Sequence, residues 1–112
     1  MSIENLLISS NEKLALSALQ KSLIADYGVE EIVAFGSGVK SVPIDGTYPD
    51  LLALTDKPVV SQQKQAMMEL VASINRTYNT NFNILVFDRD TWEVWAGQTL
   101  YMEVKREGIQ IW

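Results

Sequence analysis

The stretch of sequence that decides the fold runs from Ile32 to Thr55 and reads IVAFGSGVKSVPIDGTYPDLLALT. It begins with a short β-branched and aromatic run that ends at Phe35, and a second apolar run follows Asp50. Between the two runs lie Gly36-Ser37, residues 38 to 47 and Tyr48-Pro49. Short apolar runs bounded by glycine, proline and acidic residues are typical of buried strands. The stretch therefore predicts a strand, a turn, a loop and a second strand.

The turn after the first predicted strand has residues that suit a phosphate ligand. Gly36 lets the backbone turn sharply or come close to a ligand. Ser37 offers both a backbone N–H and a hydroxyl to phosphate oxygens. The same serine also suits a tight turn in which its hydroxyl bonds to its own backbone. The turn alone leaves both interpretations open.

Helices are predicted on both sides of this stretch. Ser9 and Glu12 have the spacing of a capping box, and leucines then fall on one helical face until Gly28 ends the helix. Three further helices are expected to begin at caps formed by Ser61, Asp90 and Thr99. A third strand is predicted at residues 82–87, and a last strand or extended tail at 109–112. This alternation predicts an α/β (α+β) fold, a small mixed β-sheet flanked by helices.

Composition restricts the chemistry that the chain can perform. With 112 residues, of which 47% are hydrophobic and 21% charged, we expect a single domain spanning 1–112. The chain has no cysteine and no histidine, so it has neither a disulfide nor the commonest general base. Carboxylates are the remaining metal ligands, and they favour hard ions such as magnesium.

Charge argues against a nucleic-acid partner. Nine basic and fourteen acidic residues give a net charge of −5, and the basic residues are scattered along the chain. A protein that binds the phosphate backbone needs a basic face to displace counterions. The sequence also has no signal-peptide pattern and no apolar run of membrane-spanning length. We therefore expect a cytoplasmic protein with no membrane partner.

The spacing around the turn resembles that of a known enzyme family. Minimal nucleotidyltransferases of the polymerase-beta type carry Gly-Ser, ten residues and then Asp-x-Asp. Here Gly36-Ser37 is followed by residues 38 to 47 and then Tyr48-Pro49-Asp50. The run Val104-Lys105-Arg106-Glu107-Gly108-Ile109, in which a predicted helix ends, is also similar to the end of many members. The resemblance covers nearly all of the chain from Leu14 onward.

The resemblance implies roles for particular residues. In this family the Gly-Ser turn holds a nucleoside triphosphate and three acids on two strands bind magnesium, which implies a phosphate site at Gly36 and Ser37, with Lys40 nearby. Asp50 matches the second acid and would be the catalytic metal ligand, whereas Tyr48 stands at the first position and Asn83 at the third. One acid of three remains, so the implied magnesium binding is weak or absent. Lys40 also suits a solvated surface, and Asp45 could supply a replacement carboxylate or simply form the turn before Gly46.

Three functions stay open on the sequence alone. The preferred hypothesis is a catalytically degenerate nucleotidyltransferase-fold protein that serves as a binding or regulatory, antitoxin-like subunit. The resemblance implies a helical HEPN-type partner, and a homo-oligomer is the alternative assembly. The second hypothesis is an active magnesium-dependent enzyme that transfers a nucleoside monophosphate from a nucleoside triphosphate to a protein or small molecule. The third is a small α/β interaction protein without a nucleotide site, whose aromatic residues Trp92, Trp95, Tyr101 and Trp112 serve the core or an interface.

Overall fold

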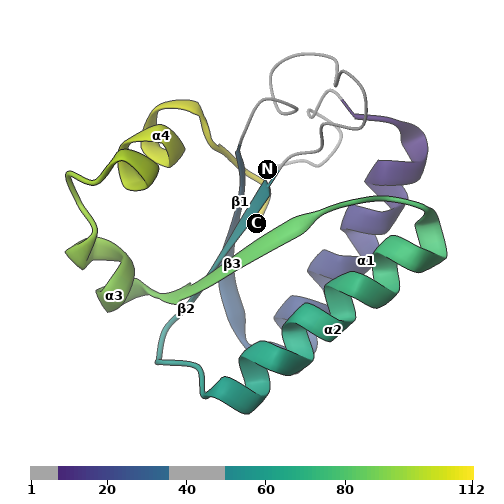
Figure 1. Cartoon of the computed structure of the whole chain (residues 1–112), viewed down its shortest axis with the longest axis horizontal. Coiled ribbons are helices and arrows are strands. Elements are labelled where there is room, and N and C mark those ends of the chain that lie inside the picture. Colours follow the sequence, from purple (N-terminus) through teal and green to yellow (C-terminus); the bar gives the residue numbers. More distant parts are fainter. Residues whose placement is uncertain (1–7, 36–49) are drawn as a thin grey trace.

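A four-stranded mixed sheet forms the centre of the molecule. The computed structural model describes residues 8–35 and 50–112 (Figure 1). Within these residues the sheet has the order β3-β2-β1-β4, formed by β1 (Val29–Phe35), β2 (Asp50–Thr55), β3 (Asn83–Asp88) and β4 (Ile109–Gln110). β1 is antiparallel to both β2 and β4, whereas β2 and β3 are parallel. The predicted fold class, a small mixed sheet flanked by helices, is confirmed.

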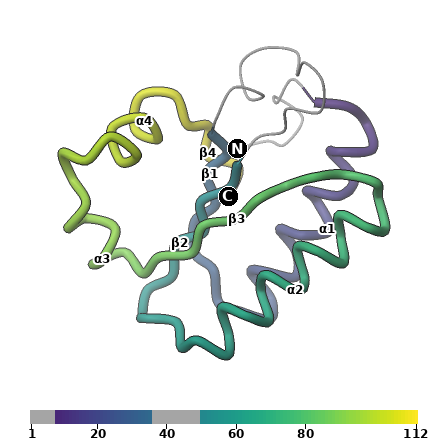
Figure 2. Tube along the Cα trace, in the orientation of Figure 1, coloured from purple at the N-terminus to yellow at the C-terminus, as the bar shows by residue number. Residues whose placement is uncertain are grey.

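Helices cover both faces of this sheet. The two long helices, α1 (Ser10–Tyr27) and α2 (Ser61–Tyr78), run side by side in opposite directions on one face, and the short helices α3 (Arg89–Val94) and α4 (Thr99–Glu107) lie on the other (Figures 1 and 2). Side chains alternate along each strand, so the sheet contributes to a separate core on each face. The larger core lies under α1 and α2. The smaller core lies under α3 and α4 and consists of Val33, Phe35, Leu52, Leu54, Trp92 and Val104.

The first helix begins and ends as its sequence predicts. The backbone N–H of Glu12 donates to Ser9 Oγ at 3.1 Å, and the backbone N–H of Ser9 donates to Glu12 Oε1 at 2.7 Å. This reciprocal pair is a capping box, which satisfies N–H groups that the helix itself cannot pair. Gly28 ends the helix with φ of 65°, a left-handed conformation that glycine adopts without steric cost.

The three other predicted caps are wrong by one or two positions. Ser61 and Thr99 are the first helical residues, because the extended cap positions before them are Val60 and Gln98, which make no side-chain cap. Asp88 rather than Asp90 caps α3, accepting a hydrogen bond from the backbone N–H of Thr91 at 3.0 Å. The physical reason is that a cap must be extended, and pairing with β2 keeps the chain extended through Asp88.

Candidate functional site

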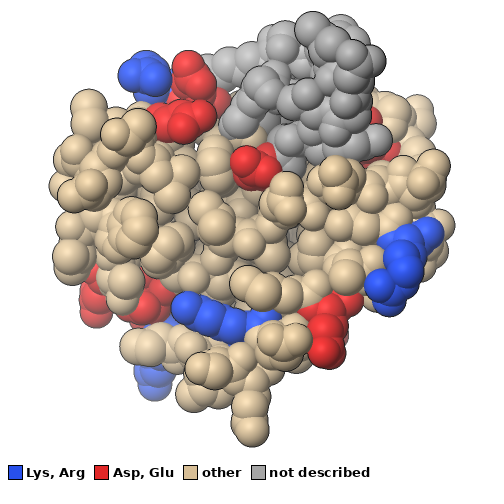
Figure 3. Space-filling view, viewed as in Figure 1, with Lys and Arg blue, Asp and Glu red and all other residues tan. Residues whose placement is uncertain are grey.

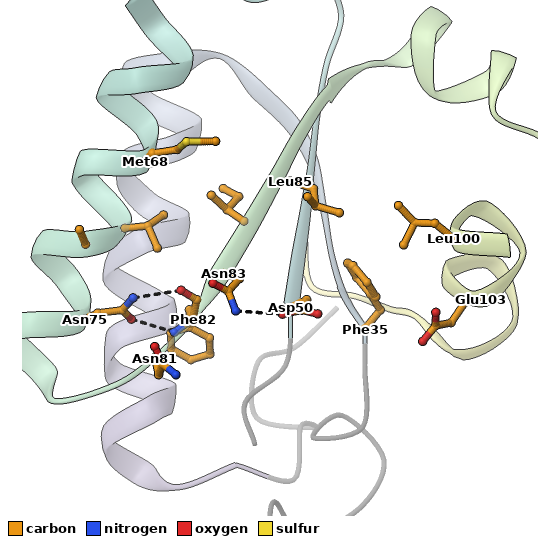
Figure 4. A pocket seen from close by; sticks show the side chains of 13 residues that line it. Phe35, Asp50, Met68, Asn75, Asn81, Phe82, Asn83, Leu85, Leu100 and Glu103 are labelled. Atoms are coloured by element: carbon orange, nitrogen blue, oxygen red, sulfur yellow. Dashed lines mark hydrogen bonds between the residues drawn. The ribbon is translucent and has the colours of Figure 1, made fainter. Parts of the chain in front are cut away.

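The candidate site begins as a row of three side chains at one end of the sheet. Asp50 pairs in register with Asn83 of β3 on one side and with Phe35 of β1 on the other. Residues that face each other across neighbouring strands point to the same side of a sheet, which here is the side of α3 and α4. The Asn83 Nδ2 group donates to Asp50 Oδ1 at 3.4 Å (Figure 4). The two positions that the sequence singled out on β2 and β3 are therefore direct neighbours.

The short helices leave this corner of the sheet open. Trp92 of α3 covers the opposite end of β3, where its ring lies 5.4 Å from that of Phe87. Val104 of α4 packs in the same core as Val33 of β1. Neither helix covers Leu85, two residues after Asn83 on the same side of β3, whose side chain is 37% exposed. A cleft of about 720 Å³ results.

The cleft lies between β3 and α4 and extends around β3 to α2. Its lining combines apolar side chains, three side-chain amides and two carboxylates (Figure 4). The lining residues are Phe35, Asp50, Met68, Val71, Ala72, Asn75, Asn81, Phe82, Asn83, Ile84, Leu85, Leu100 and Glu103. We refer to this space as the β3–α4 cleft.

An asparagine on α2 sets the start of β3 and thereby the position of Asn83. Asn75 Nδ2 donates to the carbonyl oxygen of Phe82 at 3.0 Å, and the Phe82 N–H donates to Asn75 Oδ1 at 2.9 Å. The Thr80 hydroxyl donates to the same Oδ1 at 3.0 Å. Asn75 thus pairs with Phe82 as an adjacent strand would, immediately before Asn83. No sequence pattern indicated this role, because one amide on a helix is ordinarily a solvated surface residue.

The β3–α4 cleft has acidic but no basic lining residues among those that the structure describes. Its two carboxylates, Asp50 on β2 and Glu103 on α4, are both half-buried. Glu103 was not identified from the sequence, because it lies far along the chain from the Gly-Ser turn. In Figure 3 an acidic side chain lies near the centre of the face shown and others lie at the upper left, whereas basic side chains lie at the upper left, in the lower middle and at the right.

The described residues do not fit a two-metal centre. No group of three or more acidic residues that could hold a metal ion occurs within residues 8–35 and 50–112. Asn83 directs an N–H donor, not a carboxylate, at Asp50. One strand carboxylate could bind a single nucleotide-bound magnesium ion whose shell is completed by phosphate oxygens, but two ions require more anionic ligands.

Several predicted site residues lie outside the part of the chain that the structure describes. These are the phosphate-site residues Gly36, Ser37 and Lys40, the tyrosine at the first acid position, Tyr48, and the replacement candidate Asp45. Their roles stay predictions. The role of Asp50 as a catalytic metal ligand also stays a prediction, although its location beside Asn83 and within the β3–α4 cleft is now established.

Aromatic residues of the last quarter divide between core and surface. Trp92 is buried and its ring lies 5.1 Å from that of Tyr101, whereas Trp95 and Trp112 are exposed. The Tyr101 hydroxyl donates to Glu93 Oε2 at 2.8 Å, and this hydrogen bond to a carboxylate raises the pKa of Tyr101. These contacts tie α4 to α3 and fix the side of the cleft that carries Glu103.

Ion pairing fixes the other end of α3 to the sheet. Arg89 donates to Glu31 at 2.9 Å and to Glu30 at 3.2 Å. These hydrogen bonds, that to Glu31 first, raise the pKa of Arg89. Arg89 therefore joins the first residue of α3 to β1, and it lies outside the lining of the β3–α4 cleft.

Comparison with known proteins identifies the fold. No protein-family model matches the chain, and no curated protein matches its sequence. Solved structures do match. A chain from a double mutant of the toxin–antitoxin pair MntA–HepT superposes with a TM-score of 0.59, at 14% identity, over 93% of this chain and 73% of that chain. The fold is nucleotidyltransferase-like.

Two further solved structures support the nucleotidyltransferase-like fold. A chain from the unsubstituted MntA–HepT pair has a TM-score of 0.57 at 15% identity, covering 89% of this chain and 71% of that chain. A chain from the complex of a tri-AMPylated Shewanella oneidensis HEPN toxin with MNT antitoxin has a TM-score of 0.53 at 17% identity, covering 91% and 69%. Across the described residues, no helix has both the length and the apolar character that crossing a bilayer requires.

Proposed function

We propose that this chain is the antitoxin-like subunit of a two-protein complex, with a helical HEPN-type protein as its partner and with no nucleotidyl transfer of its own. The observation that carries the proposal is the pairing of Asp50 with Asn83 inside a nucleotidyltransferase-like fold. The fold supports the first part, since the similar solved chains come from complexes named for a toxin and an antitoxin.

The chemistry of the strand ends supports the second part of the proposal. Nucleotidyl transfer with two metal ions needs carboxylates that hold both ions around the attacking and leaving oxygens. At Asn83 an amide replaces a carboxylate, and an amide is neutral and donates an N–H to its neighbour. Tyr48 stands where the family has its first acid, and a phenol is a poor ligand for magnesium. Asp50 alone supplies too little negative charge for two magnesium ions.

The proposed complex with a HEPN-type protein is tested by co-expression and purification. Each HEPN-type protein encoded in the source genome is co-expressed with this chain, and the products are measured by light scattering coupled to size-exclusion chromatography. We expect a stable complex with one of them, formed equally in magnesium and in chelator, because binding would not depend on a metal site. If none of the candidates forms a complex, the result would favour the third hypothesis, a small interaction protein without a nucleotide site.

The proposed absence of nucleotidyl transfer is tested by nucleotide binding and by a transfer assay. Thermal unfolding is measured with a panel of nucleoside triphosphates, each with magnesium or with chelator, and transfer is measured with triphosphates labelled in the α-phosphate. A ligand at about 100 times its dissociation constant adds roughly 2.7 kcal/mol of stability, a shift of several degrees in a domain of this size. We expect no magnesium-dependent shift and no transferred label. Transfer that is abolished by Asp50→Asn would instead establish the active enzyme.

A further inference from the structure

We propose that the β3–α4 cleft binds a protein partner through an arginine side chain that the partner inserts between Asp50 and Glu103, with apolar side chains on either side. This inference rests on the proposed function and deepens it, because it assigns the docking surface and the chemistry of the partner. Four features of the cleft support it.

The first feature is unbalanced charge. Asp50 and Glu103 are half-buried, and no Lys or Arg of the described residues forms an ion pair with either. The described ion pairs lie elsewhere and join Arg89 to β1 and Arg106 to Glu107. Carboxylates that are partly removed from water and form no ion pair are stabilised by a cation that enters the same space. The cleft is therefore complementary to positive charge.

The second feature is the side chain that lies between the two carboxylates, which favours an extended cation over a compact one. Phe35 on β1 is the neighbour of Asp50 on β2 in the sheet. Figure 4 shows the Phe35 side chain between Asp50 and Glu103, which lies on α4. Neighbouring strands lie about 4.8 Å apart, whereas magnesium holds oxygen ligands at about 2.0–2.1 Å. A phenyl side chain between the two carboxylates disfavours a single small ion that must touch both. A guanidinium has N–H donors on more than one edge and is better suited to two separated carboxylates.

The third feature is an acceptor beside Asp50. Asn83 uses its Nδ2 group to donate to Asp50 Oδ1, and its amide oxygen accepts no hydrogen bond from the described residues. Asn83 is exposed at the rim of the cleft. Because a guanidinium or ammonium group only donates hydrogen bonds, an amide oxygen next to a carboxylate adds to its binding.

The fourth feature is the apolar rim. Leu85 on β3 is 37% exposed and Met68 on α2 is 51% exposed, and Leu100 on α4 lines the same cleft. Exposed apolar side chains that surround a polar group are typical of the contact surface of a protein partner. A free metal ion or a phosphate would gain nothing from them. A helix with one arginine among leucine-like side chains fits both the charge and the rim.

A pair of peptides tests this proposal even while the partner is unidentified. Two helical peptides are synthesised that carry leucines around a single central position, occupied in one by arginine and in the other by its neutral isostere citrulline. Each is titrated into the 15N-labelled protein. We expect the arginine peptide to shift the amide signals of Asn83, Leu85 and Glu103, with an affinity about tenfold above that of the citrulline peptide.

Charge-neutralising variants test which carboxylates are responsible. Asp50→Asn and Glu103→Gln are each expected to weaken the arginine peptide about fivefold and to leave the citrulline peptide unchanged. The matched control is Glu69→Gln on α2, which removes one negative charge outside the cleft and should change neither affinity. All three substitutions are close in shape to the natural residue, and the amide spectra report whether each variant keeps its fold.

The outcomes separate this inference from the proposed function. Equal affinity for the two peptides, or an arginine effect that Glu69→Gln reduces as much as the cleft variants do, overturns the inference. Magnesium alone is also titrated into the natural chain and into the Asp50→Asn and Glu103→Gln variants. Shifts of the amide signals of Asp50 and Glu103 in the natural chain but in neither variant would overturn the inference in favour of a metal site. In the complex with a HEPN-type protein, binding that tolerates Asp50→Asn with Glu103→Gln would overturn the inference while the proposed function stands. Failure of every HEPN-type protein to bind would overturn the proposed function.

Discussion

Asn83 donates its side-chain N–H to Asp50 Oδ1 across the parallel strands β2 and β3, at 3.4 Å between the two atoms. The distance is long for a hydrogen bond, so the sheet register, more than the bond, holds the two side chains together. A substitution at either position therefore changes the chemistry of the site while its geometry is retained.

Asn83→Asp should create affinity for a divalent cation. The substitution places a second carboxylate directly opposite Asp50, and two adjacent carboxylates are the ligands that hard cations prefer. Manganese, which can be followed by calorimetry and by electron paramagnetic resonance, should bind at least about tenfold more tightly to the variant than to the natural chain. Asn81→Asp is the control, because Asn81 lines the same cleft but does not face Asp50. Equal gains in both variants would show that added charge, and not the pairing, is responsible.

Asn75→Ala should destabilise the fold and loosen the start of β3. The substitution removes both partly buried hydrogen bonds between the Asn75 side chain and the Phe82 backbone. Such a loss costs about 1–3 kcal/mol of the free energy of unfolding, measured by urea denaturation. Gln65→Ala, at an exposed position on the same helix, is the control and should cost under about 0.5 kcal/mol. A cost at Asn75 no larger than at Gln65 would show that β3 is held without it.

Gly108→Ala should destabilise the join between α4 and β4. A Cβ atom at this position would lie 2.5 Å from the Val104 carbonyl oxygen and 2.6 Å from Val33 Cγ1. The first contact is with backbone, which cannot rotate away, so overpacking should cost about 1–3 kcal/mol. Adding Val33→Ala removes the second contact, and a double-mutant cycle should show favourable coupling between the two changes. Strict additivity would mean that the two groups do not meet.

The charged carboxylate of Asp88 should stabilise the protein only at pH values above the pKa of that carboxyl. Hydrogen bonds from Thr91, side chain first and then backbone N–H, hold the pKa of Asp88 below its ordinary value. A carboxyl whose pKa is lower in the folded state stabilises that state above its unfolded pKa, about 3.9, and loses this contribution as pH falls through the folded value. The natural chain should therefore be more stable than Asp88→Asn at pH 7, and the difference should vanish at strongly acidic pH.

The control for this pH dependence is Asp90→Asn. Asp90 lies in the first turn of the same helix, and it is the residue that the capping pattern favoured. Because the structure gives the cap to Asp88, urea denaturation should show a smaller and less pH-dependent difference for Asp90→Asn. A larger and more pH-dependent loss of stability in Asp90→Asn than in Asp88→Asn would show that Asp90 forms the cap.

Local signals in the sequence determined most of the elements. The first helix is bounded by a capping box and a glycine, and both act within a few residues of the helix end that they fix. The predictions at Ser61, Asp90 and Thr99 failed because serine, aspartate and threonine also suit the first turn of a helix. Sheet pairing and the connection before each helix decided which residue is the last extended one, and neither is encoded at the cap itself.

The candidate site also depends partly on the sequence and partly on the tertiary structure. The family resemblance in the sequence pointed to Asp50 and Asn83, as the residues at the positions of the second and third acids. Only the tertiary structure brought them face to face, through the parallel register of β2 and β3. It also added Asn75 and Glu103, which occur in no local pattern with them. Short-range signals fix where helices and strands begin, whereas a cleft is made by residues from separate elements, and packing alone decides which of them meet.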